Sequence, residues 1–153
     1  MTLLVIREAT AADLDAALLL EASSFAEDPW TRPMLAEELD RPGGIFLVGT
    51  VDGRVVGSVI GWVVLDELHV LQVAVDPTLR GQGHGRRLME ALHAGAPRAE
   101  CAWLEVRRDN IAAITLYSRL GYQPIAERAR YYMDGCDAVV MRVAMSNGAP
   151  RDS

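Results

Sequence analysis

Lysine is absent from this chain: all 15 basic residues are arginine, against 21 acidic residues, and the formal net charge is −6. An acidic protein without a dense basic stripe lacks the composition of a general nucleic-acid-binding surface. We therefore expect no direct nucleic-acid partner. The charge balance favours a cationic partner, such as an amine or a basic peptide, although the same charge also serves solubility alone.

Cysteine and long apolar runs are scarce as well. The two cysteines, Cys101 and Cys136, have neither the spacing of metal ligands nor that of a disulfide framework, so we expect reduced thiols and no bound metal. The longest apolar run, residues 55–65, is broken by two glycines and a serine and is shorter than the ~20 residues that span a bilayer. Residues 1–7 lack the basic start of a signal peptide and are typical of a first strand. We expect a cytoplasmic protein with no membrane partner.

Strand and helix signals alternate along the 153 residues, a length typical of one domain. Apolar patterning predicts strands at 3–7, 45–51, 54–65, 67–75, 101–107, 123–129 and 137–144. Caps and helical periodicity predict helices at 10–25, 31–39, 86–94 and 111–120. This order predicts an α/β fold, one mixed sheet with helices on both faces, that spans residues 1–145 and is followed by a flexible tail at 146–153.

A glycine-rich turn follows the apolar strand 70–75 and opens the helix that we expect from Arg86. Free N–H groups and the positive end of the helix dipole converge at such a point, so the turn favours a bound pyrophosphate. Its glycines lack the Cβ atoms that would keep a phosphate away. The lysine and Ser/Thr of a P-loop are absent, and the glycine spacing differs from that of dinucleotide-binding turns. The turn consists of Arg80, Gly81, Gln82, Gly83, His84 and Gly85.

Three segments make the pattern specific. Arg80-x-x-Gly83-x-Gly85 resembles the acetyl-coenzyme A (acetyl-CoA) signature of the GNAT superfamily of N-acetyltransferases. The stretches 103–107 (Trp-Leu-Glu-Val-Arg) and 110–117 (Asn-Ile-Ala-Ala-Ile-Thr-Leu-Tyr) resemble the RimI family, which acetylates the N-terminal alanine of a small-subunit ribosomal protein. The resemblance covers nearly the whole chain in element order, although residues 1–70 carry little of it beyond Pro29-Trp30. It implies the GNAT fold, a mostly antiparallel sheet of about seven strands with splayed central strands.

The resemblance implies acetyl-CoA as cosubstrate and coenzyme A as product. Backbone groups of the splayed strand would bond the pantetheine amides, and the glycine-rich turn would hold the pyrophosphate. The strand residues are also typical of plain core, and Arg86 of a solvated helix arginine, so both alternatives stay open. The cofactor-binding residues implied are Val73, Ala74, Val75, Arg80, Gly81, Gln82, Gly83, His84, Gly85, Arg86, Asn110 and Tyr117.

Transfer to an amine requires that an ammonium lose a proton and that a thiolate leave. Strand alternation puts Trp103, Glu105 and Arg107 on one face, so Glu105 either pairs with Arg107 or faces a cleft. The resemblance makes Glu105 the general base, and partial burial is expected to raise its pKa. It also makes Tyr117, on the following helix, the general acid for the thiolate; a half-buried core tyrosine is the alternative.

The resemblance also implies an acceptor cleft, formed by Trp30, Glu67, His69, Tyr131 and Tyr132. Glu67 would attract the ammonium, His69 would help to relay its proton, and the tyrosines would bond the peptide backbone. A solvent loop, a core edge or a satisfied strand histidine is the structural alternative for each. An acceptor with basic residues is further favoured by a group of acidic residues, namely Glu37, Glu38, Asp40, Asp66 and Glu67.

The resemblance implies an N-acetyltransferase that acts on a protein N-terminus, namely the N-terminal alanine of a ribosomal protein. Transfer to a lysine side chain or a small amine is the enzymatic alternative. A non-catalytic acyl-CoA-binding module is the alternative from another class, and the presence of both Glu105 and Tyr117 argues against it. We expect a monomer or a weak homodimer.

Overall fold

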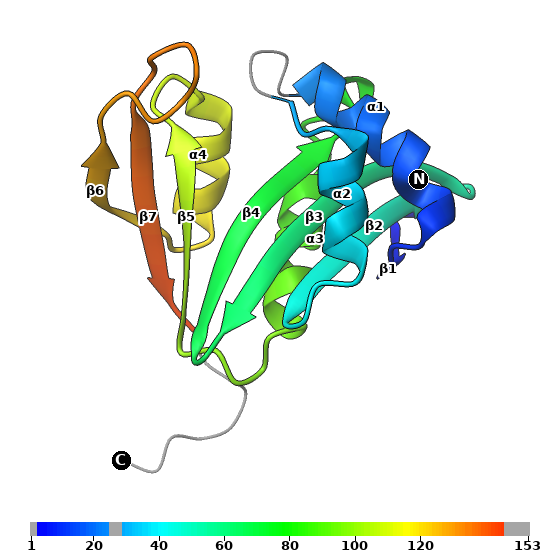
Figure 1. Cartoon of the computed structure of the whole chain (residues 1–153), viewed down its shortest axis with the longest axis horizontal. Coiled ribbons are helices and arrows are strands. Elements are labelled where there is room, and N and C mark those ends of the chain that lie inside the picture. Colours follow the sequence, from blue (N-terminus) through cyan, green and yellow to red (C-terminus); the bar gives the residue numbers. More distant parts are fainter. Residues whose placement is uncertain (1–2, 25–28, 146–153) are drawn as a thin grey trace.

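The computed structural model describes residues 3–24 and 29–145, which form one sheet with helices on both faces (Figure 1). Within these residues the sheet has seven strands in the order β1-β2-β3-β4-β5-β7-β6. Neighbouring strands run antiparallel except β4 and β5, which are parallel, so the expected mixed and mostly antiparallel sheet is confirmed. The predicted tail at 146–153 lies outside the described residues. The strands are β1 (Val5–Glu8), β2 (Gly44–Val51), β3 (Arg54–Val64), β4 (Glu67–Val75), β5 (Cys101–Arg107), β6 (Gln123–Arg128) and β7 (Ala138–Ala144).

Helices cover the two faces of the sheet unequally. α1 and α2 cover one face of β2 to β4, where Leu14 and Leu35 pack with Ile60. α3 covers the opposite face, where Leu88 packs with Leu68, and α4 lies behind β5 in Figure 1. The helices are α1 (Leu14–Ser24), α2 (Arg32–Leu39), α3 (His84–Ala94) and α4 (Ile111–Arg119), with 3₁₀ turns at Ala11–Asp13 and Pro77–Leu79.

Capping chemistry sets the start of the first helical segment. Thr10 and Asp13 form a capping box in which the Asp13 carboxylate accepts the N–H of Thr10 at 2.8 Å. The same carboxylate pairs with Arg7 of β1 at 2.8 Å, so it also ties the helix to the edge strand. The expected last residue of this helix, Phe25, lies outside the described residues.

Left-handed residues set two further boundaries. Asp52 and Gly53 connect β2 to β3 with φ of 51° and 78°, as the Asp-Gly pair predicts for a hairpin. α3 begins at His84 and not at Arg86, which corrects the predicted start. The reason is that Gly83, with φ of 83°, already serves as the N-cap.

The sheet opens between its two parallel strands. β4 and β5 pair over only four positions, residues 67–70 with residues 101–104. Beyond them β4 stays paired with β3 as far as Val75, and β5 stays paired with β7 as far as Arg107. Figure 1 shows the two strands diverging. The backbone edges that face each other beyond this point have no strand partner in the described sheet, as the resemblance implies for a splayed strand.

A β-bulge lies at this opening. Val70 faces Gly61 of β3 and Gln72 faces the next residue, Ile60, so Leu71 is an extra residue on β4. The bulge turns Leu71 and Gln72 toward the same side: Leu71 packs with the cluster under α1 and α2, and Gln72 bonds to Glu21 of α1. The place where the sheet opens is therefore tied to α1.

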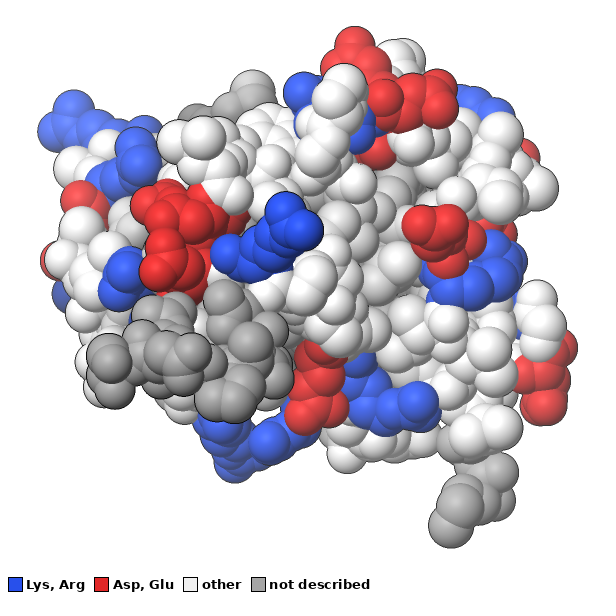
Figure 2. All heavy atoms as spheres, turned by 90° about the horizontal axis from the view of Figure 1, so that it is seen from below, with Lys and Arg blue, Asp and Glu red and all other residues white. Residues whose placement is uncertain are grey.

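The surface carries mixed charge. Figure 2 shows acidic and basic side chains in small interspersed groups on the face seen from below, not gathered into a basic stripe. Such a face provides no continuous track for a phosphate backbone. Within the described ranges, no helix combines the length and the apolar character needed to cross a membrane.

Candidate active site

The glycine-rich turn lies between the end of β4 and the start of α3. Gly81 and Gly83 have φ of 80° and 83°, and neither has a described neighbouring atom within 4 Å of the position that a Cβ would take. The turn is therefore open on the outside. The first N–H groups of an 11-residue helix begin here, so an anion is favoured at this place, in agreement with the predicted pyrophosphate cradle.

Arginines flank the turn on both sides. The Nε of Arg80 donates to the carbonyl of Val75 at 3.4 Å, which folds this side chain back over the end of β4. Arg86 pairs with Glu90 one helical turn along at 3.4 Å, and both side chains are about half exposed. An exposed pair of this kind contributes only ~0.3–0.5 kcal/mol, so Arg86 is weakly held.

His84 and Gly85 lie beneath the turn. His84 is only 6% exposed, and its Nε2 has no hydrogen-bond partner among the described residues. This corrects its predicted place in the turn: its backbone starts the helix, and its side chain is buried. A Cβ on Gly85 would lie 3.1 Å from Leu116 of α4, so this glycine allows α3 and α4 to approach each other.

The strand residues predicted for pantetheine lie on the open part of β4. Val73, Ala74 and Val75 pair with β3 on one side, and they follow the last residue that pairs with β5. Asn110 caps α4 as expected, because its Oδ1 accepts the N–H of Ala113 at 3.1 Å. Residues 73–75 thus lie on β4 beyond the point where it parts from β5, and Asn110 lies three residues after the end of β5.

Glu105 is the centre of a polar cluster where the sheet opens. Its Oε1 lies 2.7 Å from Nε2 of His69, and its Oε2 accepts the hydroxyl of Tyr131 at 3.2 Å. The Nε of Arg128 lies 3.5 Å from the same Oε2. Arg107, the alternative partner considered from the sequence, bonds Asp109 and Asp134 beyond the end of β5. The carboxylate therefore has partners from β4, β6 and the β6–β7 loop.

The pKa of Glu105 shifts against the expectation from burial. Desolvation raises it, but the hydrogen bond and charge of His69, the Tyr131 hydroxyl and the charge of Arg128 together outweigh that effect, and the pKa lies below its ordinary 4.5. The expected rise is wrong, because the sequence shows a half-buried strand position but not the donors that the fold brings to it. Glu105 is ionised at neutral pH.

Tyr117 lies on α4 and is 8% exposed, with its ring centroid 5.9 Å from that of Tyr122. Burial raises the pKa of its hydroxyl to about 12. The hydroxyl keeps its proton at neutral pH, so it can donate a hydrogen bond and cannot act as a base. Its neighbour in the chain, Leu116, lies against Gly85 below the glycine-rich turn.

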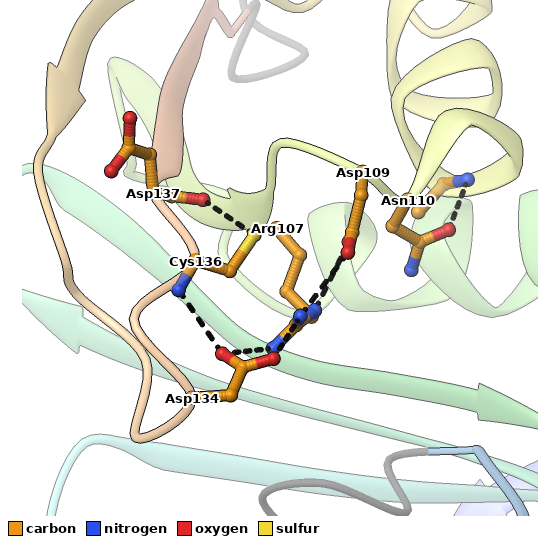
Figure 3. A network of polar contacts seen from close by, with 7 residues as sticks. Arg107, Asp109, Asn110, Asp134, Cys136 and Asp137 are labelled. Atoms are coloured by element: carbon orange, nitrogen blue, oxygen red, sulfur yellow. Dashed lines mark hydrogen bonds and ion pairs between the residues drawn. The ribbon is translucent and has the colours of Figure 1, made fainter.

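A network at the end of β5 holds the β6–β7 loop (Figure 3). Arg107 bonds to Asp134 of the loop at 2.6 Å and to Asp109 at 3.1 Å. Asp134 also accepts the N–H of Cys136 at 3.1 Å. Figure 3 shows both carboxylates converging on the guanidinium of Arg107. This network fixes the loop that carries the two predicted tyrosines.

Tyr131 and Tyr132 lie side by side in this loop, with their rings edge to face and 5.0 Å apart. The guanidinium of Arg107 lies 5.1 Å from the centre of the Tyr132 ring, and that of Arg128 lies 5.8 Å from the Tyr131 ring. Tyr131 also bonds Glu105, a contact that the sequence did not suggest. That the two tyrosines bond an acceptor backbone stays a prediction.

His69 belongs to a row of rings that crosses three strands. It lies opposite Trp62 of β3 and opposite Trp103 of β5. Its ring stacks on Trp103 at 3.8 Å with an interplanar angle of 6°, and it meets Trp62 edge-on at 6.0 Å. The stack fixes the imidazole with Nε2 at Glu105. The predicted relay histidine thus lies beside the predicted base.

Two residues predicted for the acceptor side are used in packing. Trp30 packs against the cluster under α1 and α2, and its backbone N–H donates to the carboxylate of Glu21 at 3.3 Å. Glu38, expected to attract a basic acceptor, is buried; it pairs with Arg41 at 3.0 Å and accepts the indole N–H of Trp62 at 2.6 Å. Glu38 is therefore neutralised inside the protein, which corrects its assignment to the attracting group.

One buried network was not predicted from the sequence. Glu21 is completely buried and accepts a hydrogen bond from Gln72, which in turn exchanges bonds of 3.2 Å with Ser58. Burial raises the pKa of Glu21 in spite of the bonds from Gln72 and from the N–H of Trp30. The sequence does contain a signal for this network, because Glu21 falls on the apolar face of its helix, where a buried glutamate needs a polar partner.

Three comparisons with known proteins agree with this geometry. Residues 15–122 match the model of the Acetyltransferase (GNAT) family. The N-alpha-acetyltransferase RimI of Mycobacterium tuberculosis is 38% identical over 139 residues, which cover 87% of this chain and 87% of that protein. The [ribosomal protein bS18]-alanine N-acetyltransferase of Escherichia coli is 37% identical over 139 residues, with 88% and 93% covered.

A solved structure extends the agreement to three dimensions. The crystal structure of a ribosomal-protein-alanine N-acetyltransferase from Escherichia coli matches with a TM-score of 0.87 and 33% identity, and the match covers 99% of both chains. The opening between β4 and β5 and the turn before α3 thus belong to a fold that this enzyme shares. Because the family model covers most of the chain and these relatives are similar over nearly their whole length, the chain belongs to the acetyltransferase (GNAT) family and is an N-acetyltransferase that uses acetyl-CoA.

Proposed function

We propose that this enzyme transfers the acetyl group directly to the N-terminal amine of a protein. The observation that carries the proposal is the position of Glu105, an ionised carboxylate where β4 and β5 part, held between His69 at 2.7 Å and Tyr131 at 3.2 Å. An amine that approaches from the side of the Tyr131 loop meets this carboxylate next to the opened strands, where the thioester would lie.

The residues at the opening fit acetyl-CoA. The left-handed Gly81 and Gly83 leave the turn open for the pyrophosphate, and the free edge of residues 73–75 suits the amides of pantetheine. Acetyl-CoA supplies the acetyl thioester and leaves as the free thiol. No covalent enzyme intermediate is needed, so the buried Cys101 has a packing role.

Glu105 and His69 together handle the proton of the amine. A terminal ammonium has an ordinary pKa of about 7.7–8.0, so only a minority of it is neutral at pH 7. A carboxylate with a lowered pKa is a weak base for such a proton, but its charge holds the ammonium in place. The imidazole of His69 is hydrogen-bonded to Glu105, so it gives the proton a route away from the nitrogen as it attacks.

Tyr117 acts on the sulfur that leaves. Its pKa of about 12 keeps the hydroxyl protonated, so it can donate to the developing thiolate. Full transfer to a thiol of ordinary pKa near 8.5 is unfavourable by several units. The main contribution of Tyr117 is therefore the hydrogen bond that stabilises the departing charge, and the thiol takes its final proton from Tyr117 or from solvent.

The acceptor that we propose is the N-terminal alanine of a ribosomal protein, acetylated in the cytoplasm. Support comes from the Escherichia coli relative, which is named for the alanine of ribosomal protein bS18 and is 37% identical over 139 residues. The network around Arg107 supports it as well, because it holds the Tyr131 loop across the approach to Glu105. The oligomeric state that we propose is a monomer or a weak homodimer.

Competition between three amines tests this function. The enzyme is given acetyl-CoA with a peptide that has a free alanine N-terminus, the same peptide with a blocked N-terminus and a free lysine, and a polyamine. We expect the free N-terminus to be acetylated with by far the highest kcat/KM, as measured by thiol release and mass spectrometry. Preference for the blocked peptide or the polyamine would reject the N-terminal acceptor and favour a lysine or small-amine acetyltransferase.

A further inference from the structure

The end of α4 folds the chain back onto Tyr117. Gly121 has φ of 96°, and its N–H bonds the carbonyl of Ser118 at 3.0 Å, while the N–H of Tyr122 bonds the carbonyl of Tyr117 at 3.0 Å. These two bonds form a glycine C-cap, in which the residue after the glycine contacts the last turn of the helix. The rings of Tyr117 and Tyr122 therefore pack on each other, 5.9 Å apart with an interplanar angle of 56°.

A hydrogen bond to α3 holds the other end of Tyr122. Its hydroxyl oxygen lies 2.7 Å from Nε2 of His93, in the last turn of α3. Burial lowers the pKa of His93 and raises the pKa of the Tyr122 hydroxyl, so both groups are neutral at pH 7 and one donates to the other. Tyr122 is 2% exposed, so this bond satisfies a buried hydroxyl.

The Tyr117 hydroxyl has no comparable anchor. Among the described residues it has no hydrogen-bond partner, and burial alone accounts for its raised pKa. A hydrogen bond to a departing sulfur weakens as its angle departs from linearity, so the direction of this hydroxyl matters. Packing has to set that direction, and the ring of Tyr122 lies against the ring of Tyr117. A shift of Tyr122 would therefore turn the Tyr117 hydroxyl away from the sulfur.

We propose that His93 is a positioning residue for acetyl transfer. Through its bond to Tyr122 it fixes the ring that directs the Tyr117 hydroxyl at the departing sulfur. The proposal rests on the role of Tyr117 proposed above and is independent of the acceptor. The connection consists of one hydrogen bond and one ring contact, from α3 through Tyr122 to α4.

His93 lies away from the glycine-rich turn that we propose for acetyl-CoA. It is nine positions after His84, the first residue of α3, and therefore about 14 Å from it along the helix axis. Its replacement should therefore act on the chemical step and not on cofactor affinity. An apolar side chain would leave the Tyr122 hydroxyl buried without a partner, and the ring would move to find one. A displacement of about 1 Å at a reacting group can cost about 100-fold in rate.

Single variants test the effect on the rate. His93→Leu should lower kcat about tenfold and change the KM for acetyl-CoA by less than about twofold. His93→Gln is the conservative control, because its amide can still bond the Tyr122 hydroxyl, and it should keep most of the rate. Tyr122→Phe removes the other partner and should resemble His93→Leu. Rates are measured by thiol release with the amine that the enzyme acetylates best, and coenzyme A affinity is measured by calorimetry.

A double variant separates the rate from stability. Tyr122→Phe/His93→Leu replaces both partners by apolar groups, so no hydroxyl is left buried without a partner and the thermal midpoint should return toward that of the parent. The kcat of this variant should stay low, because the bond that fixes the ring is absent. Recovery of kcat together with the thermal midpoint would assign the pair to stability alone and would overturn the proposal.

A double-mutant cycle identifies the group through which His93 acts. In a Tyr117→Phe background, His93→Leu should lower kcat by less than about twofold, because the hydroxyl that it positions is gone. The same tenfold loss in both backgrounds would reject the positioning role. An unchanged kcat in His93→Leu would reject it as well, while Tyr117 keeps its proposed role. A Tyr117→Phe enzyme as fast as its parent would reject the role of Tyr117, and with it the positioning role of His93.

Discussion

The two halves of the sheet differ in how they are covered. β2 to β4 have α1 and α2 on one face and α3 on the other, and most residues of β2 and β3 are buried. On the α4 side of β5, Ala102, Leu104 and Val106 are buried; on its other face Cys101 is buried as well, but Trp103, Glu105 and Arg107 stay partly exposed. β6, the edge strand of this half, is exposed at every position. The covered half provides a rigid scaffold, and the uncovered face leaves room for a substrate.

Two glutamates show what this difference does to chemistry. Glu21 lies in the covered half, where burial raises its pKa in spite of two hydrogen bonds. Glu105 lies on the uncovered face, where burial also acts but His69, Tyr131 and Arg128 lower the pKa below 4.5. The same side chain is thus a structural group in one half and, in the other, the ionised carboxylate that we propose as the reactive group. This carboxylate lies where the two halves part.

Replacement of Glu105 should have the largest effect. Glu105→Gln is expected to lower kcat/KM by roughly 10²- to 10⁴-fold, because the ammonium loses both its counter-charge and its proton acceptor. The rise of activity with pH near neutrality should remain, because the pKa of Glu105 lies below 4.5 and the amine sets that rise. Steady-state rates from pH 6 to 9 provide the measurement.

The control for this change is another acid of the uncovered half. Glu127 is exposed on β6 and bonds Arg108, so Glu127→Gln should leave the rate almost unchanged. A Glu105→Gln enzyme that is as fast as its parent would show that Glu105 is a structural ion-pair partner, and the contrast between the two glutamates would lose its functional meaning.

Tyr117→Phe tests the donor on α4. The loss of one hydrogen bond to a developing charge should lower kcat by about 10- to 100-fold. The ring stays in the core, so coenzyme A affinity and thermal stability should change little. Single-turnover kinetics with acetyl-CoA and the alanine peptide would measure the step. An unchanged rate would mean that the thiolate leaves without help, and would leave Tyr117 as a core residue.

A change at the glycine-rich turn should weaken cofactor binding by about tenfold. Gly83→Val forces a β-branched residue into a left-handed conformation at φ of 83°, so the turn has to move. Gly53→Val is the matched control, because Gly53 has φ of 78°, is equally open, and lies in the β2–β3 hairpin, outside the glycine-rich turn. Calorimetry with coenzyme A should separate the two. Equal affinities in folded variants would reject the cradle.

The smallest effect is expected for a substitution in the covered half, which should lower stability and leave activity unchanged. Asp13→Asn removes the charge that pairs with Arg7 and one of the two oxygens that accept from Arg7 and from the N–H of Thr10, which should lower the free energy of unfolding by about 1 kcal/mol at pH 7. The pKa of Asp13 is about 2 in the folded protein, below the ordinary 3.8, chiefly because of its bond to Arg7. Its contribution to stability is therefore full above pH 4 and is lost as the pH falls from about 4 to 2.

Urea unfolding at several pH values checks this sign. The difference in unfolding free energy between the two proteins should be constant from pH 7 to about 4 and should shrink below that. A difference that stays constant under acid would show that the Asp13 pair does not titrate as described. A large loss of activity in Asp13→Asn would contradict the view that the covered half affects stability and the uncovered face affects activity.

The local sequence determined which segments form helices and strands, and the order of these segments along the chain. The bounds of β4 and β5 agree with the predicted 67–75 and 101–107, because alternation and the flanking turn residues are visible within a few positions. The hairpin at Asp52-Gly53 and the cap at Asn110 follow from local backbone preferences in the same way. The likeness to an acetyl-CoA signature depended on glycine spacing, which is also a local property.

Tertiary structure alone decided how those elements meet. The pairing of His69 with Glu105 depends on the register of β4 against β5, and the row from Trp62 to Trp103 depends on two strand registers at once. The direction in which the pKa of Glu105 shifts depends on His69 and Tyr131, which lie 36 and 26 residues away in the chain. Periodicity shows which face a side chain takes, but the partners on that face come from distant segments, and only packing brings them within hydrogen-bond distance.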